Sequence, residues 1–176
     1  PDLMPLPRGT NPLGIPATPS SVCPADAPVK NFSVVSLDRP MKLNPKAPDA
    51  IEVDFERKIE MTMPEGKIFA LEGEATTVSS GATPHPLTLR ANVGDCIKVN
   101  LKNKMKASRA SFFAPGLAFD PKDSQGLNVG NNAGDQTVAP GESRTYTYYA
   151  HPSNKETTSL VWDGGNIVVN PRNGLY

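Results

Sequence analysis

Proline and glycine occur throughout this chain and limit what it can fold into. Of the 176 residues, 19 are proline and 14 are glycine. Proline lacks the amide hydrogen that a helix interior needs, and both residues favour turns. A chain of this length suits one domain, or one domain with a long arm. The sequence therefore predicts short strands joined by turns and disfavours a helical bundle.

The N-terminal part is the richest in proline, with 11 of the 19 prolines in residues 1–48. Residues 1–21 show no hydrophobic periodicity, and proline favours extended polyproline-II geometry. We predict an extended proline-rich arm or linker over residues 1–28 and a β-sandwich over residues 29–176. A disordered terminus and an interdomain connector both remain open for the arm.

Strand-like alternation is clearest in residues 96–102, where Ile97, Val99 and Leu101 fall on one face. No helical periodicity separates the strand-like runs, and a polar loop is expected at residues 73–86. This arrangement predicts an all-β fold, an antiparallel sandwich. We expect Trp162, the single tryptophan, to fill its core, and an exposed docking role is the alternative. The other predicted strands are residues 31–37, 49–63, 67–72, 87–90, 110–113, 143–150, 157–162 and 167–170.

Charge and motifs exclude several functional classes. Lysine plus arginine and aspartate plus glutamate each total 18, so the net charge is zero. A nucleic-acid binder needs a surplus of positive charge, so we expect no nucleic-acid partner. No apolar run approaches the roughly 18 residues that cross a bilayer, so no membrane span is predicted. Motifs for serine hydrolases, phosphate loops, dinucleotide binding and zinc proteases are absent from the sequence.

Cysteines and histidines are scarce, with two of each. Cys23 and Cys96 fit no metal-binding or redox spacing, which leaves a disulfide or two buried thiols. A disulfide would attach the arm to the main domain. His85 and His151 each precede a proline in a turn-like stretch, where a histidine is usually just exposed. A weak surface metal site that uses both histidines stays open.

Acidic residues offer a second type of metal ligand. Asp120, Asp123 and Asp135 lie close together in the sequence. Carboxylate oxygens bind hard cations, but the spacing here matches no known calcium loop. A cation site at these residues is therefore a weaker hypothesis.

Three phrases in the second half of the chain resemble a cupredoxin domain of multicopper oxidases. They are Pro-Leu-Thr-Leu-Arg-Ala-Asn-Val-Gly-Asp at 86–95, Val-Ala-Pro-Gly-Glu-Ser-Arg-Thr-Tyr at 138–146, and Asn-Pro-Arg-Asn-Gly-Leu-Tyr at 170–176. Residues 130–132 and 135–138 are most similar to the large bacterial oxidases of the manganese-oxidising type. The resemblance implies a cupredoxin-like Greek-key β-sandwich.

The copper ligands of that family are missing from the matching positions. Phe113 and Pro115 stand where one His-x-His pair is expected, and residues 160–166 lack the second pair. A type 1 copper site needs two histidines and a cysteine near the last strands, and Cys96 lies well before them. The resemblance therefore implies a domain without copper, in a parent protein whose other domains carry copper. Whether this chain takes part in catalysis stays uncertain, although we expect no catalytic residue in it.

In the resembling domains, the Gly-Leu-Tyr phrase is followed by one more apolar strand, whereas this sequence stops at Tyr176. A sandwich without that strand has an open edge. The next segment of a longer protein, an identical subunit, or the proline-rich arm could fill it. The expected partners are neighbouring cupredoxin domains or identical subunits.

Two hypotheses for the function follow. The first is a structural or interdomain domain of a larger multicopper oxidase, which would oxidise metal ions or phenols and reduce dioxygen. The alternative is a self-standing secreted assembly or binding module that forms oligomers or filaments by strand complementation. Both place the chain outside the cell, in a periplasm or on the cell surface.

Overall fold

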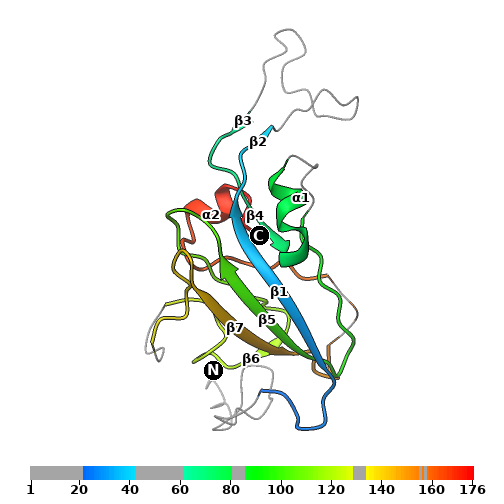
Figure 1. Ribbon diagram of the computed structural model, residues 1–176. Helices are drawn as coiled ribbons and strands as arrows, with labels where there is room; N and C mark the ends of the chain where they lie inside the picture. The colour runs from blue at the N-terminus through cyan, green and yellow to red at the C-terminus, as the bar shows by residue number, and fades with distance from the viewer. Residues whose placement is uncertain (1–21, 43–61, 81–85, 129–133, 155, 157) are drawn as a thin grey trace, which may run out of the picture.

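The computed structural model describes residues 22–42, 62–80, 86–128, 134–154, 156 and 158–176. Strands and short helices alternate with long connections (Figure 1). The elements are β1 (Val29–Asp38), β2 (Met41–Lys42), β3 (Thr62–Met63), β4 (Lys67–Leu71), η1 (Glu72–Glu74), α1 (Ala75–Ser79), β5 (Cys96–Asn103), β6 (Ala118–Phe119), β7 (Ser143–Tyr149) and α2 (Val169–Arg172).

Five strands form one sheet in the order β4-β1-β5-β7-β6, and β2 pairs with β3 separately. The predicted all-β fold is confirmed. The sheet is mixed, because β1 pairs with β5 in parallel while the other neighbours are antiparallel. The expectation of a purely antiparallel arrangement is therefore wrong. A parallel pair needs a crossover connection, and here β2, β3, β4 and α1 supply it.

The main core lies on one face of this sheet. Along β5, Ile97, Val99 and Leu101 are buried, whereas Lys98 and Lys102 are exposed, as the period of two predicts. Extended segments cover the buried face and form the second layer. Only isolated backbone pairs, Ala110 with Val138 and Phe113 with Trp162, join these segments in the described chain. The second layer is thus held more by packing than by a strand ladder.

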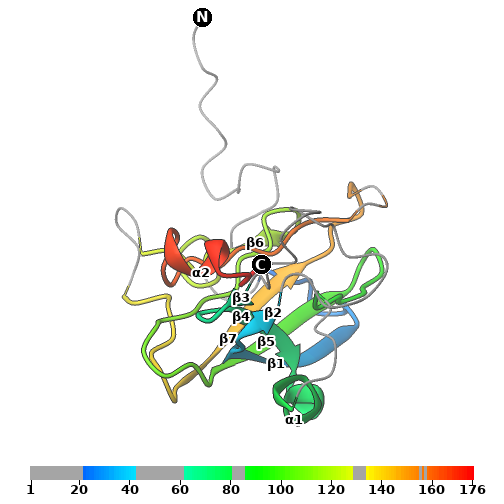
Figure 2. The ribbon, with the colours of Figure 1, turned by 90° about the horizontal axis from the view of Figure 1, so that it is seen from above.

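Two smaller clusters cover parts of the opposite face. Near β1 and β4, Val35 and Leu37 pack with Val78 of α1, and α1 and α2 lie on opposite sides of the sheet (Figure 2). At the other end of the sheet, Cys23 and Tyr149 belong to the third cluster. Between these two clusters, polar residues of the sheet are exposed to solvent.

The structure corrects several predicted strands. Residues 87–90 and 110–113 are not part of a strand ladder. Of residues 158–162, the described part of the predicted strand 157–162, only Trp162 makes a strand-like pair. Of residues 49–63, only β3 lies within the described chain.

Local hydrogen bonds explain the error at residues 167–170, of which 167–168 form a turn and 169–170 begin α2. The Asn166 side chain accepts a hydrogen bond from the Val169 amide at 3.1 Å and so favours a turn. The expected loop at residues 73–86 contains the end of η1 and all of α1. No helix in the described parts of the chain is long and apolar enough to cross a membrane.

Candidate functional site

The two phrases that resemble copper-binding motifs lie side by side in the second layer. We call residues 111–115 and 160–164 the paired segments. The Phe113 amide donates to the Trp162 carbonyl at 2.9 Å, and the Trp162 amide donates to the Phe113 carbonyl at 2.8 Å. The amide of Gly164 donates to the Ser111 hydroxyl at 2.6 Å. Segments about 50 positions apart in the sequence are therefore joined in register.

Asp163 is the polar centre of the paired segments and is only 2% exposed. Its carboxylate accepts hydrogen bonds from the amides of Ser111 at 2.7 Å and Asn166 at 3.1 Å. The Asn170 side chain donates a further bond at 2.8 Å. Burial raises the pKa of Asp163, and these hydrogen bonds oppose that shift. The sequence analysis missed Asp163, although the Asp-Gly-Gly-Asn run with Asn170 is a typical polar turn pattern.

Aromatic side chains fill the space beside the paired segments. The rings of Phe113 and Phe119 meet edge to face at 5.3 Å. Phe112 packs against Phe69 at 5.6 Å, and the Tyr148 hydroxyl donates to the Phe112 carbonyl at 2.5 Å. Burial raises the pKa of Tyr148 well above its ordinary value. These contacts give the paired segments an apolar, well-packed setting.

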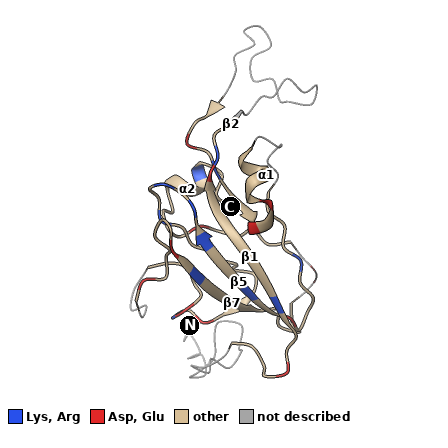
Figure 3. Ribbon diagram, in the orientation of Figure 1, with Lys and Arg blue, Asp and Glu red and all other residues tan. Residues whose placement is uncertain are grey.

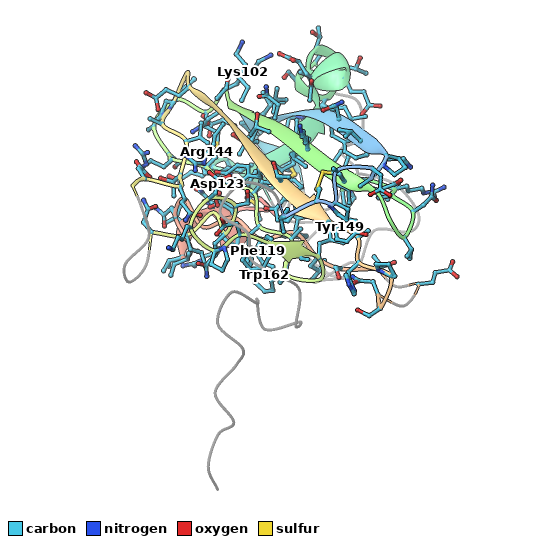
Figure 4. The ribbon with its side chains drawn as sticks, turned by 90° about the horizontal axis from the view of Figure 1, so that it is seen from below. Lys102, Phe119, Asp123, Arg144, Tyr149 and Trp162 are labelled. Carbon is cyan, nitrogen blue, oxygen red and sulfur yellow. A yellow bond between two sulfur atoms is a disulfide. The ribbon has the colours of Figure 1, made fainter. Side chains whose placement is uncertain are left out.

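Trp162 does not fill the core, because it is 49% exposed. Figure 4 shows Trp162 and Phe119 at the same side of the molecule. Leu160 is 61% exposed and precedes Trp162 in the same segment. The prediction of a core tryptophan is therefore wrong, and this side of the paired segments presents apolar side chains to solvent.

The paired segments do not fit copper. Phe113 is half-buried and Pro115 is exposed, and neither side chain has a lone pair for a metal. Asp163 is already engaged with its three hydrogen-bond donors. No group of three or more histidine, cysteine, aspartate or glutamate residues in the described parts of the chain could hold a metal ion.

The structure describes one of the two histidines, His151. His85 lies outside the described residues, so the pairing of the two histidines stays a prediction. His151 is partly exposed, and its Nδ1 lies 2.7 Å from the Ser153 hydroxyl and accepts the Ser153 amide at 3.1 Å. Its ring meets Tyr149 edge-on at 5.9 Å. These contacts orient His151 locally within its turn.

The acidic residues are used in ion pairs and hydrogen bonds. Asp123 pairs with Arg144 at 3.0 Å, and Figure 4 shows the two side chains together. Asp135 pairs with Arg109. Hydrogen bonds from Asn128 and Thr137 are the main cause that lowers the pKa of Asp135 to about 2. The arginines therefore hold two of the three candidate carboxylates, and the hypothesis of a hard-cation site loses support.

Cys23 and Cys96 form a disulfide with a Cα–Cα distance of 5.6 Å. Of the two interpretations left open by the sequence, the disulfide is the one found. The bond attaches residues 22–28 to the first residue of β5. A hollow of about 380 Å³ beside it is lined in part by Lys98, Asp120 and Thr147. Among the described residues of its walls, no group of three or more histidine, cysteine, aspartate or glutamate residues could hold a metal ion.

Comparisons with known proteins bear on the fold. No model of a known family matches the sequence, and no curated protein matches it. A solved structure described as a multicopper oxidase is similar, with a TM-score of 0.51 and 21% identity, over 83% of this chain and 39% of that one. A multi-copper oxidase from Pseudomonas thermotolerans gives a TM-score of 0.46 and 16% identity, over 71% of this chain and 23% of that one.

The chain has a cupredoxin-like all-β fold. At 21% identity, the likeness to the first structure shows the fold alone. The chain spans less than half the length of that multicopper oxidase. The Greek-key connection and the closer likeness to manganese-oxidising enzymes stay predictions from the sequence.

Proposed function

We propose that this chain is a copper-free, non-catalytic domain of a larger multicopper oxidase, in which it packs against neighbouring cupredoxin domains. The paired segments carry the proposal. They occupy the positions where the resemblance expects copper ligands, yet they contain Phe113, Pro115 and Trp162. A fold can persist after its site is lost, because the residues that stabilise a fold and those that perform chemistry are different.

The exposed side of the paired segments suits contact with another domain. Leu160 and Trp162 are 61% and 49% exposed. Tryptophan is enriched at the centres of interfaces, and exposed apolar groups gain free energy when a partner removes them from water. We therefore place the interdomain contact on this side. The domain boundaries at residues 28 and 29 belong to the same proposal.

The parent protein would oxidise metal ions or phenols and reduce dioxygen at copper held by its other domains. The similar multicopper oxidase is a longer chain, of which this chain matches 39%, and that difference leaves room for such domains. The Cys23–Cys96 disulfide supports an extracellular or periplasmic location, because structural disulfides persist in oxidising compartments.

Two measurements test the proposal. The first is the denatured mass of the protein isolated from its source: a value well above 18.8 kDa is expected for a domain of a larger enzyme. The second is copper content after the isolated chain is incubated with Cu(II) and dialysed. We expect no stoichiometric copper and no oxidation of a phenol. One tightly bound copper per chain, or oxidase activity of this chain alone, would contradict the proposal.

A mass near 18.8 kDa would favour the alternative, a self-standing secreted assembly or binding module. A specific observation supports this second candidate: the backbone of residues 87–91 in the second layer makes no hydrogen bond within the described chain. Strand addition at such groups joins many protein chains.

A further inference from the structure

Asn31, Phe32 and Ser33 of β1 form an Asn-x-Ser sequence, and the pattern Asn-x-Ser/Thr occurs only once in the chain. With any residue except proline in the middle, this pattern is the acceptor motif for N-linked glycosylation. So short a motif also arises by chance. The structure decides whether its asparagine can be reached.

Asn31 and Ser33 lie on the exposed face of β1. Phe32 and Val34 pack in the main core, so the alternation of a strand places Asn31 and Ser33 on the other face, where both are exposed. No hydrogen bond within the described chain uses either side chain. Strand β4 pairs with β1 only from Val34 onward. In the described chain, Asn31 therefore has a neighbouring strand on one side only, and its amide is accessible.

The neighbours of the motif on this face are polar. Asn31 lies beside Lys98, and Ser33 lies beside Asn100. Lys98 is exposed and makes no ion pair within the described chain, and Figure 3 shows basic residues on β5 and β7. Burying an unpaired lysine under another protein element would cost free energy, whereas a hydrated oligosaccharide leaves the ammonium group in contact with water. This face therefore suits a glycan better than a packed protein contact.

We propose that Asn31 carries an N-linked oligosaccharide. The inference rests on the extracellular location proposed above, which the Cys23–Cys96 disulfide supports because structural disulfides persist in oxidising compartments. The donor is an oligosaccharide linked to a lipid through pyrophosphate. In the transfer, Nδ2 of Asn31 gives up one proton and bonds to the first sugar carbon, while the bond from that carbon to the pyrophosphate breaks.

A glycan at Asn31 also affects where protein partners can bind. The oligosaccharide would exclude a packed partner from the exposed face of β1 and β5. The paired segments lie in the second layer, on the other side of the sheet, so the apolar surface of Leu160 and Trp162 stays accessible. The proposed interdomain contact and the glycan are therefore compatible.

Peptide mapping of the protein isolated from its source tests the inference. A peptide:N-glycosidase in water labelled with heavy oxygen removes an N-linked glycan and converts its asparagine to labelled aspartate. We expect the label at Asn31 on most copies and at no other asparagine, and an unlabelled Asn31 overturns the inference. The same map shows whether Cys23 and Cys96 are bonded. A disulfide with a bare Asn31 contradicts the glycan alone, whereas two free thiols also contradict the proposed location.

Substitutions at Ser33 supply matched controls. Ser33→Ala keeps Asn31 but destroys the motif, whereas Ser33→Thr preserves it. In cells that glycosylate and secrete the protein, Ser33→Ala should lose the whole glycan mass and Ser33→Thr should keep it. Ser33 is exposed, so neither variant should change the fold, which circular dichroism checks. A glycan that persists on the Ser33→Ala variant overturns the assignment to Asn31.

Discussion

Removing the Cys23–Cys96 disulfide tests what stabilises the segment before β1. The bond joins residues 73 positions apart, and the chain-entropy model assigns about 4 kcal/mol to a loop of that length. The two sulfur atoms also belong to a buried cluster with Ala118 and Tyr149. Deleting both sulfurs costs about a further 1–2 kcal/mol of packing. The double variant Cys23→Ala, Cys96→Ala should therefore be about 5 kcal/mol less stable than the oxidised protein.

Urea unfolding followed by circular dichroism measures this loss. The m-value should rise, because an unfolded chain without the cross-link exposes more surface. A loss of about 5 kcal/mol corresponds to a drop in Tm of roughly 10–20 °C for a domain of this size. The matched control is the wild-type chain with the disulfide reduced. This control keeps both sulfur atoms, so the difference between the two samples isolates packing from cross-linking.

Two results would refute this reasoning. If the reduced wild type is within about 1 kcal/mol of the oxidised protein, the cross-link does not constrain the unfolded chain as the entropy model requires. If the reduced protein keeps its stability and only the alanine variant loses it, packing around Ala118 and Tyr149 contributes most of the stabilisation. In either case residues 22–28 would be held by contacts and not by the disulfide.

Three further predictions concern the second layer and pH. Asp163→Asn should lower the free energy of unfolding in urea by about 2–4 kcal/mol, because an amide NH₂ would then face buried donors. An unchanged midpoint of urea unfolding would contradict the role of Asp163 as the polar centre of the paired segments. Trp162→Ala should lower the free energy of unfolding by less than about 1 kcal/mol, whereas Phe112→Ala, at a buried site, should lower it by about 3–5 kcal/mol. Equal losses would contradict the exposure of Trp162. Asp135 has a pKa lowered to about 2, so its contribution to stability is complete above the ordinary aspartate pKa and lost as pH falls toward 2. Asp135→Asn should flatten that acid limb of the stability profile.

The sequence predicts the central strands well because their side chains have two different environments. Residues 96–102 alternate apolar and polar, and the structure buries the apolar side chains in β5. The run at 143–150 is rich in β-formers, and β7 covers Ser143–Tyr149. The resemblance puts a pair of expected copper motifs at Phe113 and Pro115 and at residues 160–166, and the structure pairs Phe113 with Trp162. In each case the pattern reflects contacts with the main core.

The pattern of apolar residues does not predict the structure where local hydrogen bonds of polar side chains determine the backbone conformation. Ile167 and Val168 have high strand propensity, yet they are 67% and 68% exposed in a turn. The Asp163 carboxylate accepts the Asn166 amide, and the Asn166 side chain accepts the Val169 amide. Such side-chain bonds compete directly with strand pairing. No count of hydrophobic residues contains that information, so the sequence does not predict the turn.

The paired segments are stabilised by contacts that leave little room for a metal ligand. In the domains that this chain resembles, metal ligands would lie on these two segments, whereas here they are joined by the Phe113–Trp162 backbone pair and by the bonds to Asp163. The edge-to-face contact of Phe113 with Phe119 fills apolar space that a ligand could not fill without losing packing. Burying the Asp163 carboxylate also costs little free energy of folding as long as its three hydrogen-bond donors remain in place. These contacts make a metal site at the paired segments unfavourable, because any metal ligand would have to displace them.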